Sequence, residues 1–180
     1  MGDLMDAIRN RRSIRHYQAK DVPAGVLERV LEAVRWSPSW ANTQCWEIVV
    51  VKDPEVKLKL QETLVKGNPA ARAMVEAPLV LAVCGRLQAA GYYKGQVTTK
   101  LGDWFMFDLG IATQSLCLAA HDEGLGTVIA GLLDHEKARE VLHVPAGYEV
   151  VALIPVGYPD KGAGAPTRRE IGEFVHFDKF

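Results

Sequence analysis

The sequence lacks an excess of charge of either sign. Its 180 residues contain 21 Lys and Arg against 22 Asp and Glu, so the formal net charge is −1. Proteins that bind nucleic acid over a broad surface are usually basic, with lysines and arginines spread along one face. We therefore expect no nucleic-acid partner. No stretch approaches the roughly 20 apolar residues that a membrane-spanning helix needs, so we expect no membrane partner either.

The residue patterns of several site classes are also missing. The three cysteines, Cys45, Cys84 and Cys117, have no CxxC spacing, which excludes a disulfide framework or a zinc site and favours a cytoplasmic protein. The five histidines show no i, i+4 pairing, so we expect no metal. No serine lies in a GxSxG motif. Gly124 and Gly126 follow a helical segment and precede a strand, which is the reverse of a dinucleotide-binding fingerprint.

The pattern of apolar residues along the chain indicates one α+β domain. A length of 180 residues suits a single well-buried unit, and we assign it to 1–180. Helices and strands mix without regular βαβ alternation, which predicts a sheet flanked by helices. The spacing of apolar residues predicts helices at 4–8, 26–34, 55–65 and 134–142, a short helix through 74, and an almost wholly apolar helix at 103–122. Apolar runs predict strands at 46–51, 79–84, 127–130 and 150–157. Residues 85–96 have the least pattern and are interpreted as a loop or lid, within a wider region 85–102.

An arginine cluster is the clearest functional signal. Arg11, Arg12 and Arg15 surround Ser13 within five residues, and a second basic pair follows at 168–169. Guanidinium groups are fork-shaped donors that suit phosphate oxygens, so the cluster predicts a phosphorylated cofactor. The alternative is a solvated helix end whose arginines pair with nearby carboxylates, namely Asp3, Asp6 or Glu28.

Four segments in order resemble the FMN-dependent nitroreductases, and together they extend over almost the whole chain. They are Arg11-Arg12-Ser13-Ile14-Arg15, the run from Ser37 to Trp46, Gly124-Leu125-Gly126-Thr127, and Val156-Gly157-Tyr158-Pro159. The resemblance implies a nitroreductase-like fold with a mixed, mainly antiparallel sheet. It also implies an interlocked homodimer with FMN at the subunit interface and a C-terminal arm, about 160–180, exchanged between the chains.

The resemblance also assigns roles around the FMN phosphate. Guanidinium groups would neutralise the phosphate, one hydroxyl would bind it, and one further arginine would reach the pyrimidine side of the flavin ring. A cation at that ring edge favours the reduced, anionic flavin. The phosphate residues are Arg11, Arg15 and Arg168, with Arg169 as a possible alternate, and Ser13; the ring residue is Arg12.

Further residues would contact the ribityl chain or the ring. Ser39 and Asn42, on a loop that Pro38 stiffens, would come from the partner chain. Gln44 is either a cofactor contact or a hydrogen-bonded loop residue. Asp108 on the long helix either faces the pocket or pairs with Lys100 or Arg72.

The segment Ile129-Ala130-Gly131 would lay its backbone against the flavin ring, with Gly131 permitting close approach. Two positions depart from the family pattern. Cys45 stands where family members often have proline, and Ala130 stands where well-studied members have a glutamate beside the flavin. The alanine would leave the contact to flavin N5 to a backbone amide alone.

The implied function is that of an FMN-dependent NAD(P)H oxidoreductase. Hydride from NADH or NADPH would reach the flavin, and nitroaromatics, quinones or related electron-poor acceptors would take the electrons in a ping-pong cycle. The flavin itself does the chemistry, so no catalytic side chain is assigned. Two alternatives stay open: a narrower reductase acting on enones, halogenated aromatics or the flavin itself, and a flavin-binding protein without turnover. The 85–102 region would decide among acceptors.

Overall fold

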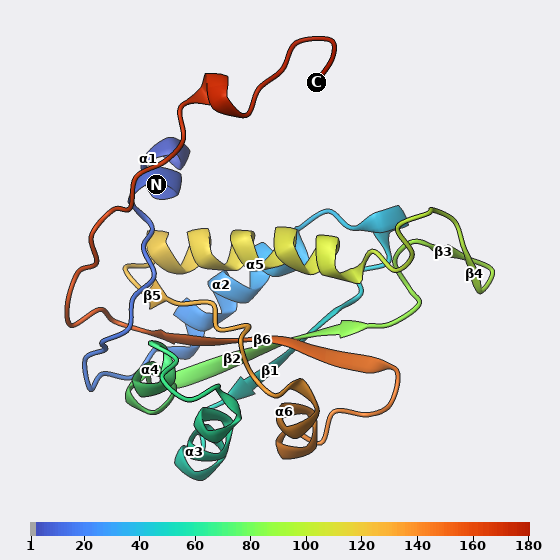
Figure 1. The fold of residues 1–180 in the computed structure, drawn as a ribbon. Coiled ribbons are helices and arrows are strands. Elements are labelled where there is room, and N and C mark those ends of the chain that lie inside the picture. Colours follow the sequence, from blue (N-terminus) through green and yellow to red (C-terminus); the bar gives the residue numbers. More distant parts are fainter. Residues whose placement is uncertain (1–2) are drawn as a thin grey trace.

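The computed structural model describes residues 3–180 and is built around one four-stranded antiparallel sheet. The strands are β1 (Trp46–Val51), β2 (Leu79–Arg86), β5 (Gly126–Thr127) and β6 (Tyr148–Gly157), in the order β1-β2-β6-β5. Helices cover both faces of the sheet (Figure 1). The α+β class and the predicted positions of three of these strands are therefore confirmed.

Two helical layers divide the core. The helices α2 (Ala24–Arg35) and α5 (Phe105–Asp122) lie on one face, and α3 (Pro54–Thr63), α4 (Ala71–Glu76) and α6 (His135–Val141) on the other (Figure 1). Alternate residues of β2 point into the two layers, since Leu79, Leu81 and Val83 join one buried cluster and Val80, Ala82 and Cys84 the other. A strand buried on both faces has no polar side, which explains its continuous apolar run.

Helix starts follow the sequence signals. Asp3 precedes α1 (Leu4–Asn10) and accepts a hydrogen bond from the Met5 N–H, while Asp53 caps α3 in the same way. Asp134 caps α6 by accepting from the Lys137 N–H at 3.0 Å, as its position predicts.

The strand predicted at 127–130 is shorter than expected. Only Gly126–Thr127 pairs regularly, and Ala130 resumes the pairing as a single bridge to Leu153 in the same antiparallel register. That register places Val128 opposite Pro155. Because proline has no N–H to donate, the ladder is interrupted there.

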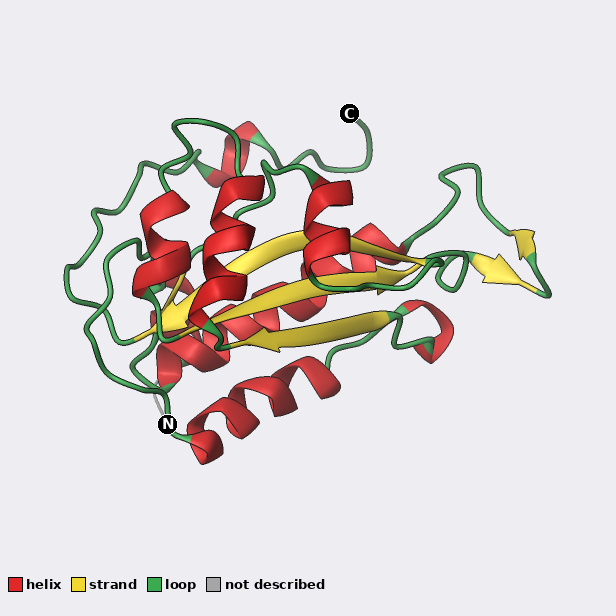
Figure 2. Cartoon of the chain, turned by 90° about the horizontal axis from the view of Figure 1, so that it is seen from below, coloured by secondary structure: helices red, strands yellow, loops and turns green. Residues whose placement is uncertain are grey.

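The segment 85–102 is more ordered than a loop. Its first residues extend β2 to Arg86, and its middle forms a small hairpin from β3 (Tyr92–Tyr93) and β4 (Gln96–Val97). The hairpin projects from the body of the molecule (Figure 2). Trp104 anchors its base, donating from its backbone N–H to Ala90 O at 3.0 Å and from Nε1 to Thr99 Oγ1 at 2.7 Å.

Two apolar regions are open in the single chain. The almost wholly apolar helix α5 is not fully covered in one chain, because Met106 is 55% exposed and Phe107 60%. The C-terminal arm, 160–180, runs away from the body past α1 (Figure 1), and carries the exposed side chains Ile171, Phe174 and Phe177. It has only a short 3-10 turn, Ile171–Glu173.

Candidate functional site

The arginine segment is fixed to the edge of the sheet beside β5. Ser13 forms a parallel bridge with Thr127, and the Ile14 N–H donates to Thr127 O at 2.9 Å. Ile14 is buried against Gly126, where a Cβ would lie only 2.6 Å from Ile14 Cγ1. In extended backbone successive side chains point to opposite sides, so burying Ile14 turns its neighbours Ser13 and Arg15 away from the core.

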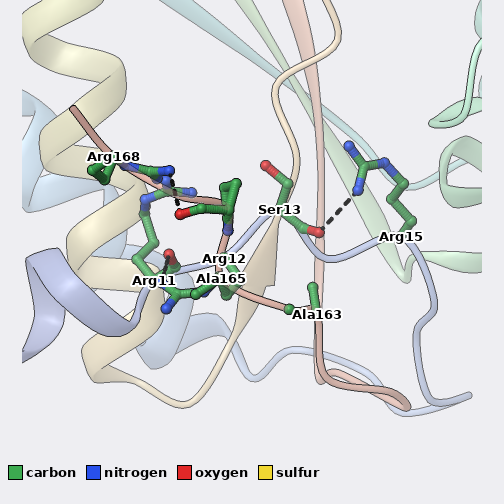
Figure 3. A pocket seen from close by; sticks show the side chains of 9 residues that line it. Arg11, Arg12, Ser13, Arg15, Ala163, Ala165 and Arg168 are labelled. Atoms are coloured by element: carbon green, nitrogen blue, oxygen red, sulfur yellow. Dashed lines mark hydrogen bonds between the residues drawn. The ribbon is translucent and has the colours of Figure 1, made fainter.

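A cleft of about 480 Å³, called here the arginine cleft, opens beside this segment. Its lining combines the N-terminal segment with the arm, as predicted for one site, and carries no acidic side chain. Figure 3 shows Arg11, Arg12 and Arg168 gathered on one side of Ser13 and Arg15 on the other. The lining residues are Arg11, Arg12, Ser13, Arg15, Ala163, Gly164, Ala165, Pro166 and Arg168.

The carboxylate-paired alternative does not hold for this cluster. Within residues 3–180, none of the arginines that line the cleft forms an ion pair with an acidic side chain. Their observed partners are backbone carbonyls. Arg12 donates to Arg11 O at 2.8 Å, and Arg168 donates to Pro166 O at 3.0 Å.

Arg15 carries an unused donor. Its Nη1 reaches Ser13 O at 3.4 Å, whereas its buried Nε has no hydrogen-bond acceptor in residues 3–180. Buried donors are rarely left without a partner. Four arginines and a serine hydroxyl that line a cleft without carboxylates fit a phosphate group, such as the phosphate end of FMN.

Arg169 does not join this cleft. Its guanidinium donates to the Glu173 backbone carbonyl and lies 5.7 Å from the Phe174 ring centroid. The second basic pair therefore divides in this chain, with one arginine in the cleft and one folded back on the arm.

The loop holding Ser39, Asn42 and Gln44 is closed by its own hydrogen bonds. Ser39 Oγ accepts from the Gln44 N–H at 2.9 Å, and Asn42 Oδ1 accepts from Gln44 Nε2 at 3.2 Å. These hydrogen bonds fit the loop role, which is one of the two roles that the sequence left open for Gln44. Ala41, Asn42 and Gln44 all have positive φ, between 43° and 56°, a conformation that non-glycine residues rarely adopt.

Asp108 holds this strained loop. It is 2% exposed, and its two carboxylate oxygens accept from the Trp40 N–H at 3.0 and 3.1 Å, while Cys45 Sγ lies 3.6 Å from one of them. Of the two roles that the sequence left open for Asp108, the pair with Lys100 or Arg72 is not formed within residues 3–180. The sequence did not reveal this function, because the partner is a backbone amide 68 residues away.

One chain does not bring the Ser39 loop to the arginine cleft. Asp108, beside the loop, and His121, which lines a cavity with Arg11 and Arg12, lie on the same helix α5. At 1.5 Å per residue they are about 20 Å apart along its axis. The two predicted halves of the cofactor site therefore lie at opposite ends of this helix.

The segment 129–131 borders a third cavity, of about 580 Å³. Ile129 is 49% exposed and lines it together with Gly131. The Ala130 N–H donates to Leu153 O at 3.0 Å, so this amide is already paired within the sheet. The next amide, of Gly131, has no backbone acceptor in the described residues. An added Cβ at Gly131 would meet nothing nearer than Val151 O at 3.8 Å, which leaves space above it.

Other site classes find little support. Within residues 3–180 no three His, Cys, Asp or Glu side chains group closely enough to hold a metal ion. None of the helices there is both long and apolar enough to cross a membrane. The three cysteines are buried, and burial raises the pKa of Cys45 and of Cys84 to about 11, which disfavours a reactive thiolate.

Comparison with known proteins gives a consistent relationship. The model of the nitroreductase family matches residues 8–158. The NADH dehydrogenase of Thermus thermophilus is 31% identical over 192 aligned residues, which cover 93% of this chain and 91% of that protein. The 5,6-dimethylbenzimidazole synthase of Rhodospirillum rubrum is 29% identical over 189, covering 94% and 89%.

A solved structure agrees with the sequence relatives. The FMN-dependent nitroreductase of Clostridium difficile R20291 superposes with a TM-score of 0.81 at 27% identity, over 98% of this chain and 99% of that one. These relationships favour an enzyme over a flavin-binding protein without turnover. With its fold, its arginine segment and a family match extending from residue 8 to 158, the chain belongs to the nitroreductase family of oxidoreductases.

Proposed function

We propose that this chain is a homodimeric, FMN-dependent NAD(P)H oxidoreductase that reduces nitroaromatics, quinones or related electron-poor acceptors. The observation that carries the proposal is the arginine cleft, where four arginines and Ser13 line one space without a carboxylate. The relative whose name includes FMN has the same fold. The cleft supplies the charge that the FMN phosphate, at about −1.5 to −2, requires.

The side chains divide between the two ends of the cofactor. Arg11, Arg15 and Arg168 would bind the phosphate, and Arg12 would extend to the pyrimidine edge of the ring. The free Gly131 N–H, rather than the Ala130 amide, is the donor available to the ring. Arg169 is not assigned to the phosphate, because its guanidinium is held by its own arm.

The position of the loop residues supports the proposed dimer. Ser39 and Asn42 lie at the opposite end of α5 from the arginine cleft, about 20 Å away along the helix. A two-fold axis through the middle of α5 would bring the loop of one chain to the cleft of its partner. The open face of α5 suits such a contact, because Met106, Phe107 and Leu118 line an apolar groove on it. The exposed arm 160–180 would exchange between the chains in the same dimer.

Bound FMN would supply a ring that accepts a hydride from the nicotinamide and later passes two electrons to the acceptor. The protein would bind and orient the reactants, so no side chain is assigned as acid or base. Because both substrates would use one ring face in turn, the steady-state kinetics should be ping-pong. For a nitroarene the balanced two-electron reaction consumes one NAD(P)H and one proton, and yields the nitrosoarene, water and NAD(P)⁺.

The visible absorption spectrum of the purified protein tests the proposal. We expect a flavin spectrum that bleaches on anaerobic addition of NADH or NADPH and returns when an acceptor is added. Sedimentation of the coloured protein should give a dimer. A colourless protein that also takes up no added FMN would refute the cofactor, and the cleft would then belong to another phosphate ligand.

A further inference from the structure

The Tyr17 hydroxyl joins two backbone carbonyls from distant parts of the chain. It lies 2.8 Å from Ile14 O and 3.0 Å from Pro155 O, and the tyrosine is only 7% exposed. Ile14 belongs to the arginine segment, whereas Pro155 belongs to β6 at the point where pairing with the 126–130 segment is interrupted. A buried side-chain donor therefore links the arginine segment to the sheet at a gap in the strand pairing.

Ile14 is held on three sides as a result. Its N–H donates to Thr127 O at 2.9 Å, its carbonyl accepts from the Tyr17 hydroxyl, and its side chain is buried. Because both polar backbone groups of Ile14 are paired and its side chain is packed, its φ and ψ angles are fixed. The residues on either side, Ser13 and Arg15, are therefore held at the arginine cleft before a ligand binds.

We infer that Tyr17 is a positioning residue for the cofactor phosphate. By fixing the Ile14 carbonyl, its hydroxyl holds Ser13 and Arg15 in the arrangement that binds a phosphate monoester. The inference deepens the proposed function and rests on it, because it adds to the FMN site a residue that sets how tightly the phosphate is held. Tyr17 itself does not line the arginine cleft, so it acts through its neighbours and not by contact with the ligand.

The backbone around Tyr17 makes a second connection, to the start of the C-terminal arm. Tyr17 forms an antiparallel bridge with Pro159. The next residue, Gln18, donates from its N–H to Tyr158 O at 2.9 Å and from Nε2 to Pro159 O at 2.7 Å. The arm that begins here supplies Arg168 to the arginine cleft. Tyr17 thus lies where the two chain segments that line the cleft are joined, and its hydroxyl ties this junction to β6.

The surroundings of Tyr17 suit its hydroxyl to this role. Burial raises the pKa of Tyr17 above its ordinary value, so the hydroxyl keeps the proton that it donates. The ring packs closely as well, because a Cβ added at Gly157 would lie 3.1 Å from Tyr17 Cδ1. The substitution Tyr17→Phe keeps this packing and removes only the donor, so it isolates the contribution of the two hydrogen bonds.

Two flavins that differ only in the phosphate test the inference. FMN and riboflavin share the ring and the ribityl chain, and riboflavin lacks the phosphate. Titration of the full-length apoprotein, followed by the quenching of flavin fluorescence, gives a Kd for each. We expect Tyr17→Phe to raise the Kd for FMN about 3- to 10-fold and the Kd for riboflavin less than about twofold. A variant that keeps the wild-type preference for FMN, or that weakens both flavins equally, would overturn the inference.

Tyr158→Phe is the matched control. It removes the same atom from a tyrosine at the start of the same arm. The side-chain contact observed for Tyr158 is made by its ring, whose centroid lies 3.7 Å from Lys20 Nζ. Both Kd values of this variant should therefore stay within about twofold of the wild type. A loss of FMN affinity in Tyr158→Phe equal to that in Tyr17→Phe would show a general effect of the arm, and would overturn the inference.

A double variant tests whether Tyr17 acts through the phosphate residues. If its hydroxyl positions Arg15, the two side chains are coupled and their effects on FMN binding do not add. In an Arg15→Met background, Tyr17→Phe should raise the Kd for FMN by a smaller factor than in the wild-type background. Full additivity would show a role for Tyr17 that is independent of Arg15, and would overturn the inference.

Hydrogen exchange of the wild-type apoprotein gives a test that needs no variant. The amides of 13–17 should exchange more slowly than those of the exposed arm, 168–176, before any FMN is added. A segment 13–17 that exchanges as fast as the arm and becomes protected only when FMN binds is not positioned in advance. That result would overturn the inference, even if Tyr17→Phe does not fold.

The outcome for the proposed function remains separate. A wild-type protein that takes up no FMN refutes that function and the inference with it. The inference fails alone if the wild type binds FMN in preference to riboflavin and Tyr17→Phe retains the same preference.

Discussion

Replacing Arg15 by methionine should separate cofactor binding from stability. Within residues 3–180 the buried Arg15 Nε has no acceptor, and the Arg15 Nη1 makes one long contact, 3.4 Å, to Ser13 O. Bound phosphate would accept a hydrogen bond from the Arg15 guanidinium, which lines the cleft without a carboxylate partner in residues 3–180. A hydrogen bond to a charged group contributes about 1.5–3 kcal/mol, so Arg15→Met should weaken FMN binding roughly 10- to 150-fold.

The same change should cost the apoprotein no stability. Methionine keeps an unbranched apolar stem, and the variant removes a buried donor that lacks a partner. The assay is titration of apoprotein with FMN, followed by the quenching of flavin fluorescence, beside urea unfolding of the apoprotein. Arg169→Met is the control, since Arg169 lies outside the cleft and should alter the Kd less than about twofold. An unchanged Kd for Arg15→Met, or equal losses in both variants, would refute the assignment.

Three further predictions concern the loop, the thiols and the dimer. Asp108→Ala leaves the Trp40 N–H without its acceptor and should lower the free energy of unfolding by about 1–3 kcal/mol in urea; an unchanged urea midpoint would contradict this. Burial, with the Asp108 carboxylate nearby, raises the pKa of Cys45 to about 11. The unfolded chain therefore releases the Cys45 thiol proton at a lower pH than the folded chain does, so the free energy of unfolding should fall between about pH 9 and 11. This fall should be less steep in Cys45→Ala, and parallel pH profiles for the variant and the wild type would contradict the prediction. Gly110→Glu adds a charge to the open face of α5 where a Cβ meets no atom within 4 Å, so it should give a folded monomer that binds FMN poorly; a dimer in sedimentation would exclude this face as the interface.

Much of the architecture could be predicted because local patterns fixed it. Apolar runs identify β1, β2 and β6, since each strand faces buried side chains. Aspartates before α1, α3 and α6 mark where those helices begin. The length predicted for the strand at 127–130 is too great, because the interruption of its pairing depends on Pro155, which belongs to a different strand. The same limit applies to the 85–102 hairpin, whose anchor is Trp104.

The candidate site divides in the same way. The sequence by itself determined that Arg11, Arg12, Ser13 and Arg15 form a compact set of donors, because neighbours in an extended segment stay together in any fold. Only the tertiary structure decided that Arg168 joins them while Arg169 turns away, that the Ala130 amide is already paired, and that Asp108 holds the Trp40 amide. The pairing of the Ala130 amide and the role of Asp108 each depend on a backbone group that the fold brings near. Every residue has those groups, so the sequence gives no sign of which one a side chain will find.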